Sequence, residues 1–405
     1  MIVFKMAWRN IWRNKRRTYI TMASIFFAVI LSSFMMSIKE GMYAQMIDST
    51  IGNYTGFIQI NTSAFTEDHL LDDGMEFTES IITILDLESK ISHYIPRIEN
   101  FALAAGADQT KGSMVIGTDI EKERQATELH KRVIDGTYLS KSDEGVLVGK
   151  GLAEYLKVKA GDTLVLLSQG YHGSSAAGKF PIRGIVTFGS PELSKQLVIL
   201  TLENAQQFYS CSGIVTQINI WPEDDKLDKS MLSRLEKSFD DDLDVRTWKE
   251  VLPEVSDMIE ADKVEGYVFM FILYLVISFG IFGTLLMMLI ERMYEFGMLI
   301  SIGMKRSKLA LMVWFEAVAL TLAGAMLGIL GAVPICYYFN LNPIKFGNEI
   351  EKMFEEYGFE AVMRTSLDLN IFLEQAVLIV LVSSILSLYP FMKILRMNAL
   401  SAMKA

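Results

Sequence analysis

Four long apolar runs alternate with polar stretches along the chain, and they predict four membrane-spanning helices. The runs cover residues 18–38, 266–290, 309–339 and 369–392. Each is about as long as, or longer than, the roughly 20 residues that a helix needs to cross a bilayer. We therefore expect an α-helical integral membrane protein.

The stretch between the first two runs contains short apolar segments with different spacings of their hydrophobic residues, and no long apolar run. Alternating or short apolar segments predict strands, and segments with helical spacing predict helices. The predicted strands are 56–60, 101–105, 114–117, 146–148, 163–167, 180–188, 197–200 and 216–220; the predicted helices are 78–94, 152–156, 202–208 and 227–239. This mixture is typical of an α+β domain, placed here at residues 52–247. Residues 18–51 are then a first membrane helix with an outward stalk, and residues 248–290 are a second stalk and membrane helix.

Charge predicts which side of the membrane each part occupies. Residues 48–265 carry 37 acidic and 21 basic residues, while the whole chain has a net charge of −10. The remainder is therefore net positive, and its basic residues flank the apolar runs. Cytoplasmic segments of membrane proteins are enriched in Lys and Arg. We expect residues 1–17, 291–308 and 393–405 in the cytoplasm, and the large domain and the loop 340–368 outside.

Residues 1–17 carry six basic and no acidic residues, and their apolar positions share one helical face. They predict an amphipathic basic helix lying in the cytoplasmic interface. Nucleic-acid binding is the alternative for such a helix, but the apolar run that follows favours membrane anchoring.

Few residues offer chemistry of their own. Cys211 and Cys336 fall in different parts of the chain, and the four histidines lack ligand spacing. Residues 173–179 fit the phosphate-loop pattern G-x4-G-K, but Phe180 stands where a magnesium-binding Ser or Thr is needed. We interpret this stretch as a hairpin loop. We predict no catalytic, cofactor or metal site in this chain.

The polar segment 291–308, ERMYEFGMLISIGMKRSK, lies between the second and third apolar runs. It predicts a short helix with one apolar side, which includes Met298, Leu299 and Ile302. Gly303 suits the left-handed end of such a helix, and Ser307 could cap the next. Two interpretations stay open here: an interfacial turn among lipid headgroups, or a docking site for another protein.

The third apolar run contains small residues and one carboxylate. Gly324, Gly328 and Gly331 are candidate helix-packing residues, because small side chains let membrane helices approach closely. Glu316 lies about two turns inside the run. We expect it to be a near-interface carboxylate paired with a basic neighbour.

Several of these motifs together resemble the MacB/FtsX-type permeases of ABC transporters. The segment 291–308 matches the family's Glu-Arg, Glu-(Ile/Val)-Gly and Gly-basic pattern, with Phe296 in place of a small aliphatic residue. Residues 149–167 and 201–208 resemble its MacB-like periplasmic core domain. The C-terminal sequence from Tyr389 and Pro390 onward resembles the C-terminal sequence pattern of the family, with Asn398 at a position where proline is usual. The layout is nearest to the lipoprotein-releasing LolC/LolE-type permeases.

The resemblance implies a function for the segment 291–308. In this family it contacts a dimer of cytoplasmic ATPase subunits, which would bind the ATP and Mg. The implied coupling residues are Glu291, Arg292, Glu295, Phe296, Gly297, Leu299, Gly303, Lys305 and Arg306. We expect Leu299 to enter a groove on the ATPase and Glu295 to meet a basic residue there.

The resemblance also implies the wider system. The chain would be a permease of the bacterial inner membrane and not an enzyme by itself. It would pair with a second permease chain. Together they would move lipoproteins or other amphipathic substrates by mechanotransmission, the transfer of movement from the ATPase to the outer domain. Contacts with membrane lipid are expected, and nucleic acid is not. An FtsX-like regulator of a cell-wall hydrolase is one alternative, and a membrane sensor is another.

Overall fold

The computed structural model of the chain describes Arg13 and residues 15–188, 191–223, 227–239, 242–345, 347 and 362–398. The helix predicted over 1–17 therefore lies largely outside the described residues, as do most of the loop 340–368 and the last seven residues of the tail. The chain divides into two compact units. The helix unit comprises the described parts of residues 1–44, 259–344 and 362–405, and the sheet unit those of residues 45–258 and 345–361.

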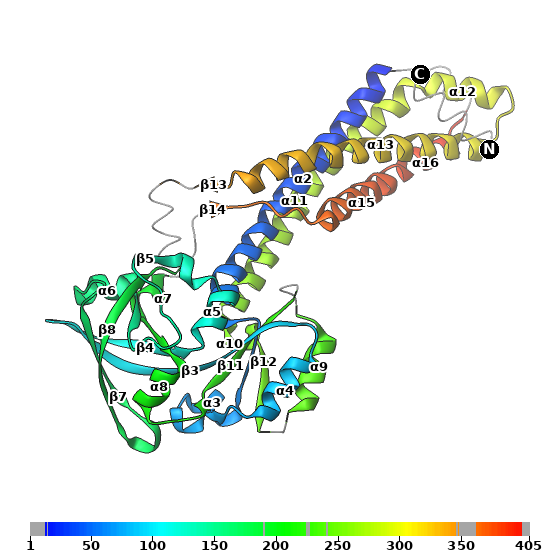
Figure 1. The fold of residues 1–405 in the computed structure, drawn as a ribbon. Helices are drawn as coiled ribbons and strands as arrows, with labels where there is room; N and C mark the ends of the chain where they lie inside the picture. The colour runs from blue at the N-terminus through cyan, green and yellow to red at the C-terminus, as the bar shows by residue number, and fades with distance from the viewer. Residues whose placement is uncertain are drawn as a thin grey trace. The chain divides into compact units, whose positions relative to one another are not determined.

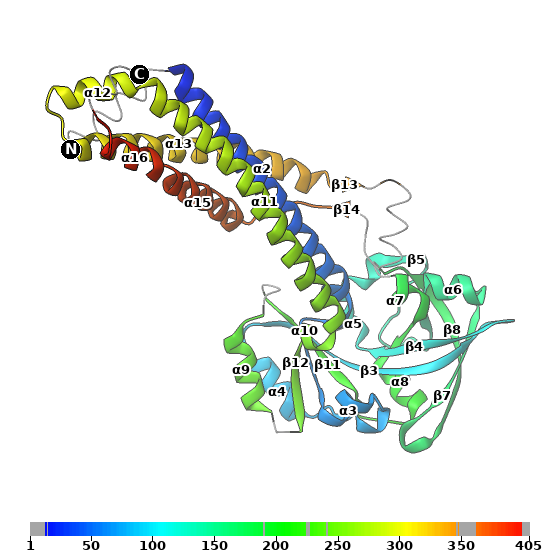
Figure 2. The same cartoon turned by 180° about the vertical axis from the view of Figure 1, so that it is seen from behind.

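The helix unit is built from long apolar helices. Four stretches among the described residues are long and apolar enough to cross a membrane: Thr18–Thr55, Pro253–Glu291, Arg306–Leu341 and Leu369–Leu395. They correspond to the four predicted runs, and all extend beyond them. The helices are α2 (Lys15–Ile47), α11 (Pro253–Glu291), α12 (Met293–Ser301), α13 (Arg306–Leu341), α15 (Leu369–Leu386) and α16 (Leu388–Leu395). Within the helix unit, α2 runs beside α11, and α13 beside α15 and α16 (Figure 1, Figure 2).

The fourth predicted helix is two helices, with a break at Ser387. Pro390 is the third residue of α16 and has no N–H to donate to a carbonyl one turn earlier. The break places this proline in a first helical turn, where an N–H would have no helical partner in any case.

Glycines bring α13 against α2. A Cβ atom added at Gly328 would lie 2.6 Å from Cβ of Val29, and one at Gly324 would lie 2.9 Å from Cβ of Ile25. Gly331 faces Ile30 and Phe26 of the same helix. The predicted small-residue stripe is therefore a close contact surface, and its partner is α2.

Polar side chains also join the helices inside the apolar unit. The hydroxyls of Thr321 and Ser383 are 2.7 Å apart between α13 and α15. Tyr274 of α11 donates to Gln375 of α15, and Lys39 of α2 contacts Asp262 of α11 at 3.1 Å. Such contacts hold membrane helices in register, because lipid offers polar groups no other partner.

The sheet unit contains a ten-stranded mixed sheet in the order β12-β1-β11-β3-β4-β9-β6-β8-β5, with β7 pairing β3 and β8. Among the described strand pairs of this sheet, β4–β9 and β6–β8 are parallel and the others antiparallel. The strands are β1 (Ile58–Thr62), β3 (Ile91–Ala105), β4 (Thr110–Thr118), β5 (Val133–Gly136), β6 (Val146–Gly149), β7 (Thr163–Gln169), β8 (Ser175–Val186), β9 (Leu197–Thr201), β11 (Gln217–Pro222) and β12 (Leu243–Thr247). A two-stranded sheet pairs β2 (Met75–Glu76) with β10 (Ile214–Val215).

Helices cover the sheet with apolar residues. The helices α4 (Glu79–Leu87) and α9 (Lys229–Ser238) pack on the isoleucines of β1 and β11, including Ile58 and Ile218. The helices α6 (Lys150–Leu156) and α8 (Leu202–Tyr209) pack on the strands around β6 and β9. The short helices α3 (Ser63–Asp68), α5 (Ile120–Ala126), α7 (Pro191–Gln196) and α10 (Trp248–Val251) complete the unit, with the π-helix Asp48–Thr55 after α2.

Two predictions for this unit were partly wrong. The helix predicted over 78–94 ends at Leu87, and Ile91 already begins β3, because its β-branched residues pair with β11. The stretch 173–179 is not all loop, since Ser175 begins β8 and Lys179 pairs with Val165 of β7. Because strand and not helix follows Gly173, its amides do not form the helix N-terminus that a phosphate loop provides.

One buried charge cluster in this unit was not anticipated. Arg97, only 1% exposed, lies 2.8 Å from Oε1 of Glu123 and also donates to the carbonyl of Tyr54. It joins β3, α5 and the π-helix Asp48–Thr55. A lone arginine within a strand gives no sequence signal for such a partner set.

The glycine contact between α13 and α2 predicts a specific loss of stability. Gly328→Val should lower the melting temperature of the detergent-solubilised protein, because overpacking costs about 1–3 kcal/mol. Thermal unfolding followed by size-exclusion chromatography measures the effect. Gly283→Ala in α11 is the matched control, since an added Cβ there meets nothing within 4 Å; equal melting temperatures for the two variants would refute a tight contact.

Candidate functional site

The segment between α11 and α13 forms a short helix with sharp ends. Arg292 separates α11 from α12, with φ −110° and ψ 7°. Gly303 has φ +105°, a region that favours glycine, just after α12 ends at Ser301. The next helix is capped at Lys305 and not at Ser307, and no side chain makes the cap hydrogen bond.

The inner side of α12 is packed into the helix unit. Phe296 is fully buried, and Gly297 is buried beside it. Leu299 and Ile300 are partly buried against a cluster from α13 and the end of the chain, which includes Leu309 and Ile394. Leu299 therefore contacts its own chain on one side, and the expectation that it enters a groove on the ATPase stays a prediction.

A buried ion pair fixes the start of α12 to α13. Nη1 of Arg292 lies 3.0 and 2.8 Å from the two carboxylate oxygens of Glu316. Glu316 is 0% exposed and Arg292 is 6% exposed. The guanidinium also lies 5.1 Å from the ring centroid of Phe296, close enough for a cation–π contact. The expectation that Glu316 pairs with a basic neighbour is confirmed.

Glu295 extends this pair into a chain of alternating charges. Nε of Arg292 is 3.3 Å from Oε2 of Glu295, and Arg13 donates to the same oxygen. Partial burial by itself would raise the pKa of Glu295, but the hydrogen bond and charge of Arg13, with the charge of Arg292, lower it overall. Glu295 thus has two basic partners in its own chain, Arg13 and Arg292, and its expected contact with a basic residue of the ATPase stays a prediction.

The outer side of α12 carries an exposed apolar stripe. Tyr294, Met298 and Ile302 are 59%, 43% and 78% exposed. Their spacing of four residues puts them on one helical face. Glu291, Lys305 and Arg306 border the segment and are also exposed. We call Tyr294, Met298 and Ile302 the outer stripe.

This arrangement is suited to contact and to the transfer of movement. The described residues hold no group of three or more His, Cys, Asp or Glu side chains that could bind a metal ion. Arg292 and Phe296 attach α12 to α13 through an ion pair and apolar packing. The nine predicted coupling residues differ in burial. Arg292, Phe296 and Gly297 are buried, Glu295 and Leu299 are partly buried, and the others are exposed.

Sequence reasoning missed two of these features. Residues 1–17 contain six basic residues. Nothing in the sequence distinguishes Arg13 from the other five as the partner of Glu295. The outer stripe did have a signal, since Tyr294, Met298 and Ile302 recur at i, i+4 and i+8. The adjacent apolar residues Leu299 and Ile300 obscured it.

The buried ion pair predicts a graded loss of stability. Glu316→Ala should cost about 3–5 kcal/mol, because it leaves the buried charge of Arg292 with only the partly exposed Glu295 as a carboxylate partner. Glu316→Gln should cost less, since its amide oxygen still accepts a hydrogen bond from the guanidinium. Thermal unfolding and proteolysis within 291–308 measure both. Glu291→Gln, an exposed carboxylate nearby, should change little; similar losses for all three would contradict a dominant role for the pair.

Two family models match the chain, one on each side of residue 250. The MacB-like periplasmic core domain matches residues 18–238, and the FtsX-like permease C-terminal domain matches residues 267–399. The second match contains α12 and its neighbours α11 (from residue 267) and α13.

Individual proteins are also similar to parts of this chain. The chain is 21% identical over 336 residues to the lipoprotein-releasing system transmembrane protein LolC of Neisseria meningitidis serogroup B, covering 78% of each chain. It is 22% identical over 262 residues to LolC of Xylella fastidiosa, covering 62% of each. The periplasmic region of MacB from Actinobacillus actinomycetemcomitans aligns with a TM-score of 0.36 and 12% identity, over 52% of this chain and 95% of that one.

The first family model alone matches more than half of the chain, and the second accounts for most of the rest. The matched residues include the mixed sheet of the sheet unit up to residue 238 and, within the second match, three of the four long apolar helices. The chain therefore belongs to the MacB/FtsX superfamily of ABC transporter permeases.

Proposed function

We propose that this chain is the permease subunit of an ATP-driven transporter, and that α12 receives force from a separate cytoplasmic ATPase dimer. The observation that carries the proposal is the division of α12 into two sides. Its inner side is fixed to α13 by Arg292 and Phe296, while its outer stripe is exposed. A docking element needs both a rigid attachment and a free surface.

The proposed orientation puts α12 in the cytoplasm. Lys305, Arg306 and Lys308 are exposed at this end, and basic residues of short loops favour the cytoplasmic side. The sheet unit would then lie outside the inner membrane of a bacterium, with both termini inside. ATP and Mg would be bound by the partner, and this chain would supply no catalytic group.

The proposed movement runs along the helices that bear α12. Pushing α12 would displace α13 through the buried ion pair, and α2 through the glycine contacts of α13. The polar bonds of α11 to α2 and α15 would spread the displacement within the helix unit. Packed interfaces of this kind transmit movement because they are close-packed and deform little.

The proposed substrates are lipoproteins or other amphipathic molecules. The two LolC relatives carry the words lipoprotein-releasing in their names. Four candidate spans in one chain provide few helices for a solute channel. We therefore propose a second permease chain, identical or related, and release of the substrate at the outer face.

The orientation can be tested with single cysteines. A Ser142→Cys variant should be labelled by an impermeant maleimide in intact cells, because Ser142 is exposed in the sheet unit. Lys308→Cys, exposed beside α12, should react only after the membrane is opened. The native Cys211 and Cys336 are buried and should give little background. The reverse pattern would overturn the orientation.

The docking surface can be tested by purification from native membranes. The wild-type chain should retain an ATPase and a lipidated polypeptide, whereas Ile302→Asp should lose the ATPase while the chain remains folded. Burying an unpaired carboxylate in an apolar contact costs on the order of several kcal/mol, and Ile302 is the most exposed residue of the outer stripe.

Two comparisons sharpen this test. Ser307→Asp adds the same charge at an exposed position off the stripe and should keep the ATPase. Leu299→Asp should lower thermal stability, because Leu299 packs within its own chain. Retention of the ATPase by Ile302→Asp would show that the docking site lies elsewhere. Recovery of a cell-wall hydrolase without lipidated material would favour a regulator over a transporter.

A further inference from the structure

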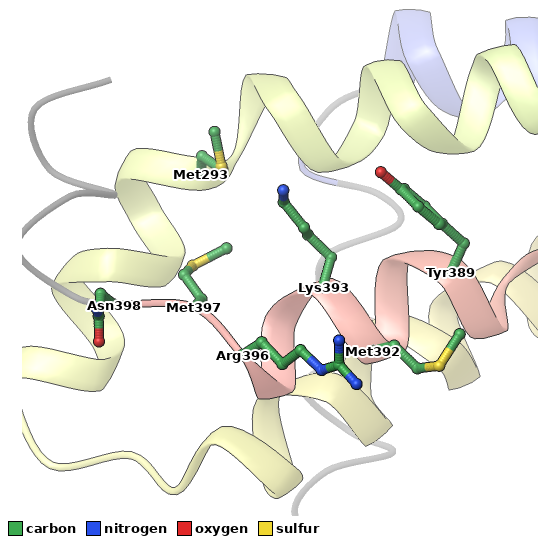
Figure 3. A pocket seen from close by; sticks show the side chains of 7 residues that line it. All are labelled: Met293, Tyr389, Met392, Lys393, Arg396, Met397 and Asn398. Carbon is green, nitrogen blue, oxygen red and sulfur yellow. The ribbon is translucent and has the colours of Figure 1, made fainter.

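A hollow of about 590 Å³ lies beside α16, at the same end of the helix unit as α12. Its walls are formed by Met293, Tyr389, Met392, Lys393, Arg396, Met397 and Asn398. Figure 3 shows Lys393 and Tyr389 reaching from α16 toward the segment that carries Met293. The volume falls in the range of small-molecule sites, which is about 300–1,000 Å³.

The two cations of the hollow have no counter-ion among the described residues. Neither Lys393 nor Arg396 forms an ion pair there, and both are exposed. The carboxylates of the neighbouring α12 and α13, Glu295 and Glu316, are already engaged by arginines. Within the described part of the helix unit, no carboxylate therefore forms an ion pair with Lys393 or Arg396.

The lining combines these charges with apolar side chains. Met293 and Met397 give the hollow soft, adaptable walls, and Tyr389 adds an aromatic ring with a polar tip. Favourable interaction with the negative end of α16 would explain a basic residue at this position. It does not explain why two cations border a hollow that methionines also line.

An exposed apolar stripe leads along the helices to the same place. Leu381, Ile385, Leu388 and Met392 are 53%, 65%, 46% and 51% exposed, and they follow one another at spacings of four, three and four residues. Arg396 comes four residues after Met392, so a charge ends the stripe. An apolar surface along the helices is thus followed by a cation. A phospholipid has the complementary order, with an acyl chain followed by a phosphate headgroup.

We propose that the hollow is a binding site for an anionic phospholipid, with Lys393 and Arg396 holding the phosphodiester and the stripe contacting an acyl chain. Basic pockets between membrane helices bind anionic headgroups on the cytoplasmic side. The proposal rests on the membrane insertion proposed above, but not on the docking of an ATPase. A bound lipid would hold α16 against the start of α12, next to the segment proposed to receive force.

The test compares lipid retention between charge-matched variants. Full-length protein is reconstituted in nanodiscs of phosphatidylcholine with phosphatidylglycerol, extracted into detergent, and examined by native mass spectrometry for retained lipid. The double variant Lys393→Gln with Arg396→Gln should retain about 25-fold less phosphatidylglycerol, because each cation near the membrane surface contributes about fivefold in affinity. Phosphatidylcholine retention should not change. Lys305→Gln with Lys308→Gln removes the same charge at exposed positions outside the hollow and should retain phosphatidylglycerol normally.

Each other outcome has a defined meaning. Equal losses in both double variants would indicate general surface charge and would overturn the proposal. Displacement of the lipid by inorganic phosphate alone would indicate a free-phosphate site instead. Unchanged lipid retention together with loss of a co-purifying ATPase would assign the two cations to a protein contact. Lys393→Arg with Arg396→Lys should retain the lipid, which separates loss of charge from loss of fold.

Discussion

The buried pair of Arg292 and Glu316 is the constraint on which the arrangement around α12 depends. A carboxylate at 0% exposure inside an apolar helix is very costly without a cation. Arg292 supplies that cation only if α11 stops and the chain turns, since both residues must meet across two helices. The turn then sets where α12 begins and which of its sides faces inward.

This constraint explains why α12 has two different apolar surfaces. Once Arg292 is held, Phe296 and Leu299 follow on the side that faces α13, and Tyr294, Met298 and Ile302 fall on the other. A helix that lay loosely on a membrane surface would have no need to bury an arginine, a phenylalanine and a glycine at one end. The second surface is therefore available to a partner without weakening the first.

The proposed lipid site and the proposed docking surface are neighbours with different chemistry. The outer stripe is apolar and lies on α12, whereas the hollow beside α16 is bordered by Lys393 and Arg396, which form no ion pair with the residues that the structure describes. Met293, the first residue of α12, lines the hollow. A ligand there would affect the same short helix that the ion pair positions, so lipid composition and force transfer would act on one element.

The sequence by itself determined the class of this protein. Apolar runs longer than a bilayer crossing have few alternatives, and their positions in the chain predicted the layout of four long helices with a mixed α+β domain after the first. The segment 291–308, Gly303 as a helix end and the pairing of Glu316 also followed from local pattern. Short elements of the sheet unit were less secure, as Ile91 shows, because a β-branched run becomes strand only when a neighbour such as β11 is there to pair with it.

Only the tertiary structure decided which residues meet. It placed the glycines of α13 on α2, gave Glu295 an intrachain partner in Arg13, and turned Leu299 inward while leaving Ile302 exposed. It also brought Met293 and Lys393, one hundred residues apart, to one hollow. These outcomes depend on contacts between distant segments, and the spacing of residues along one helix contains no information about which other helix will cover it.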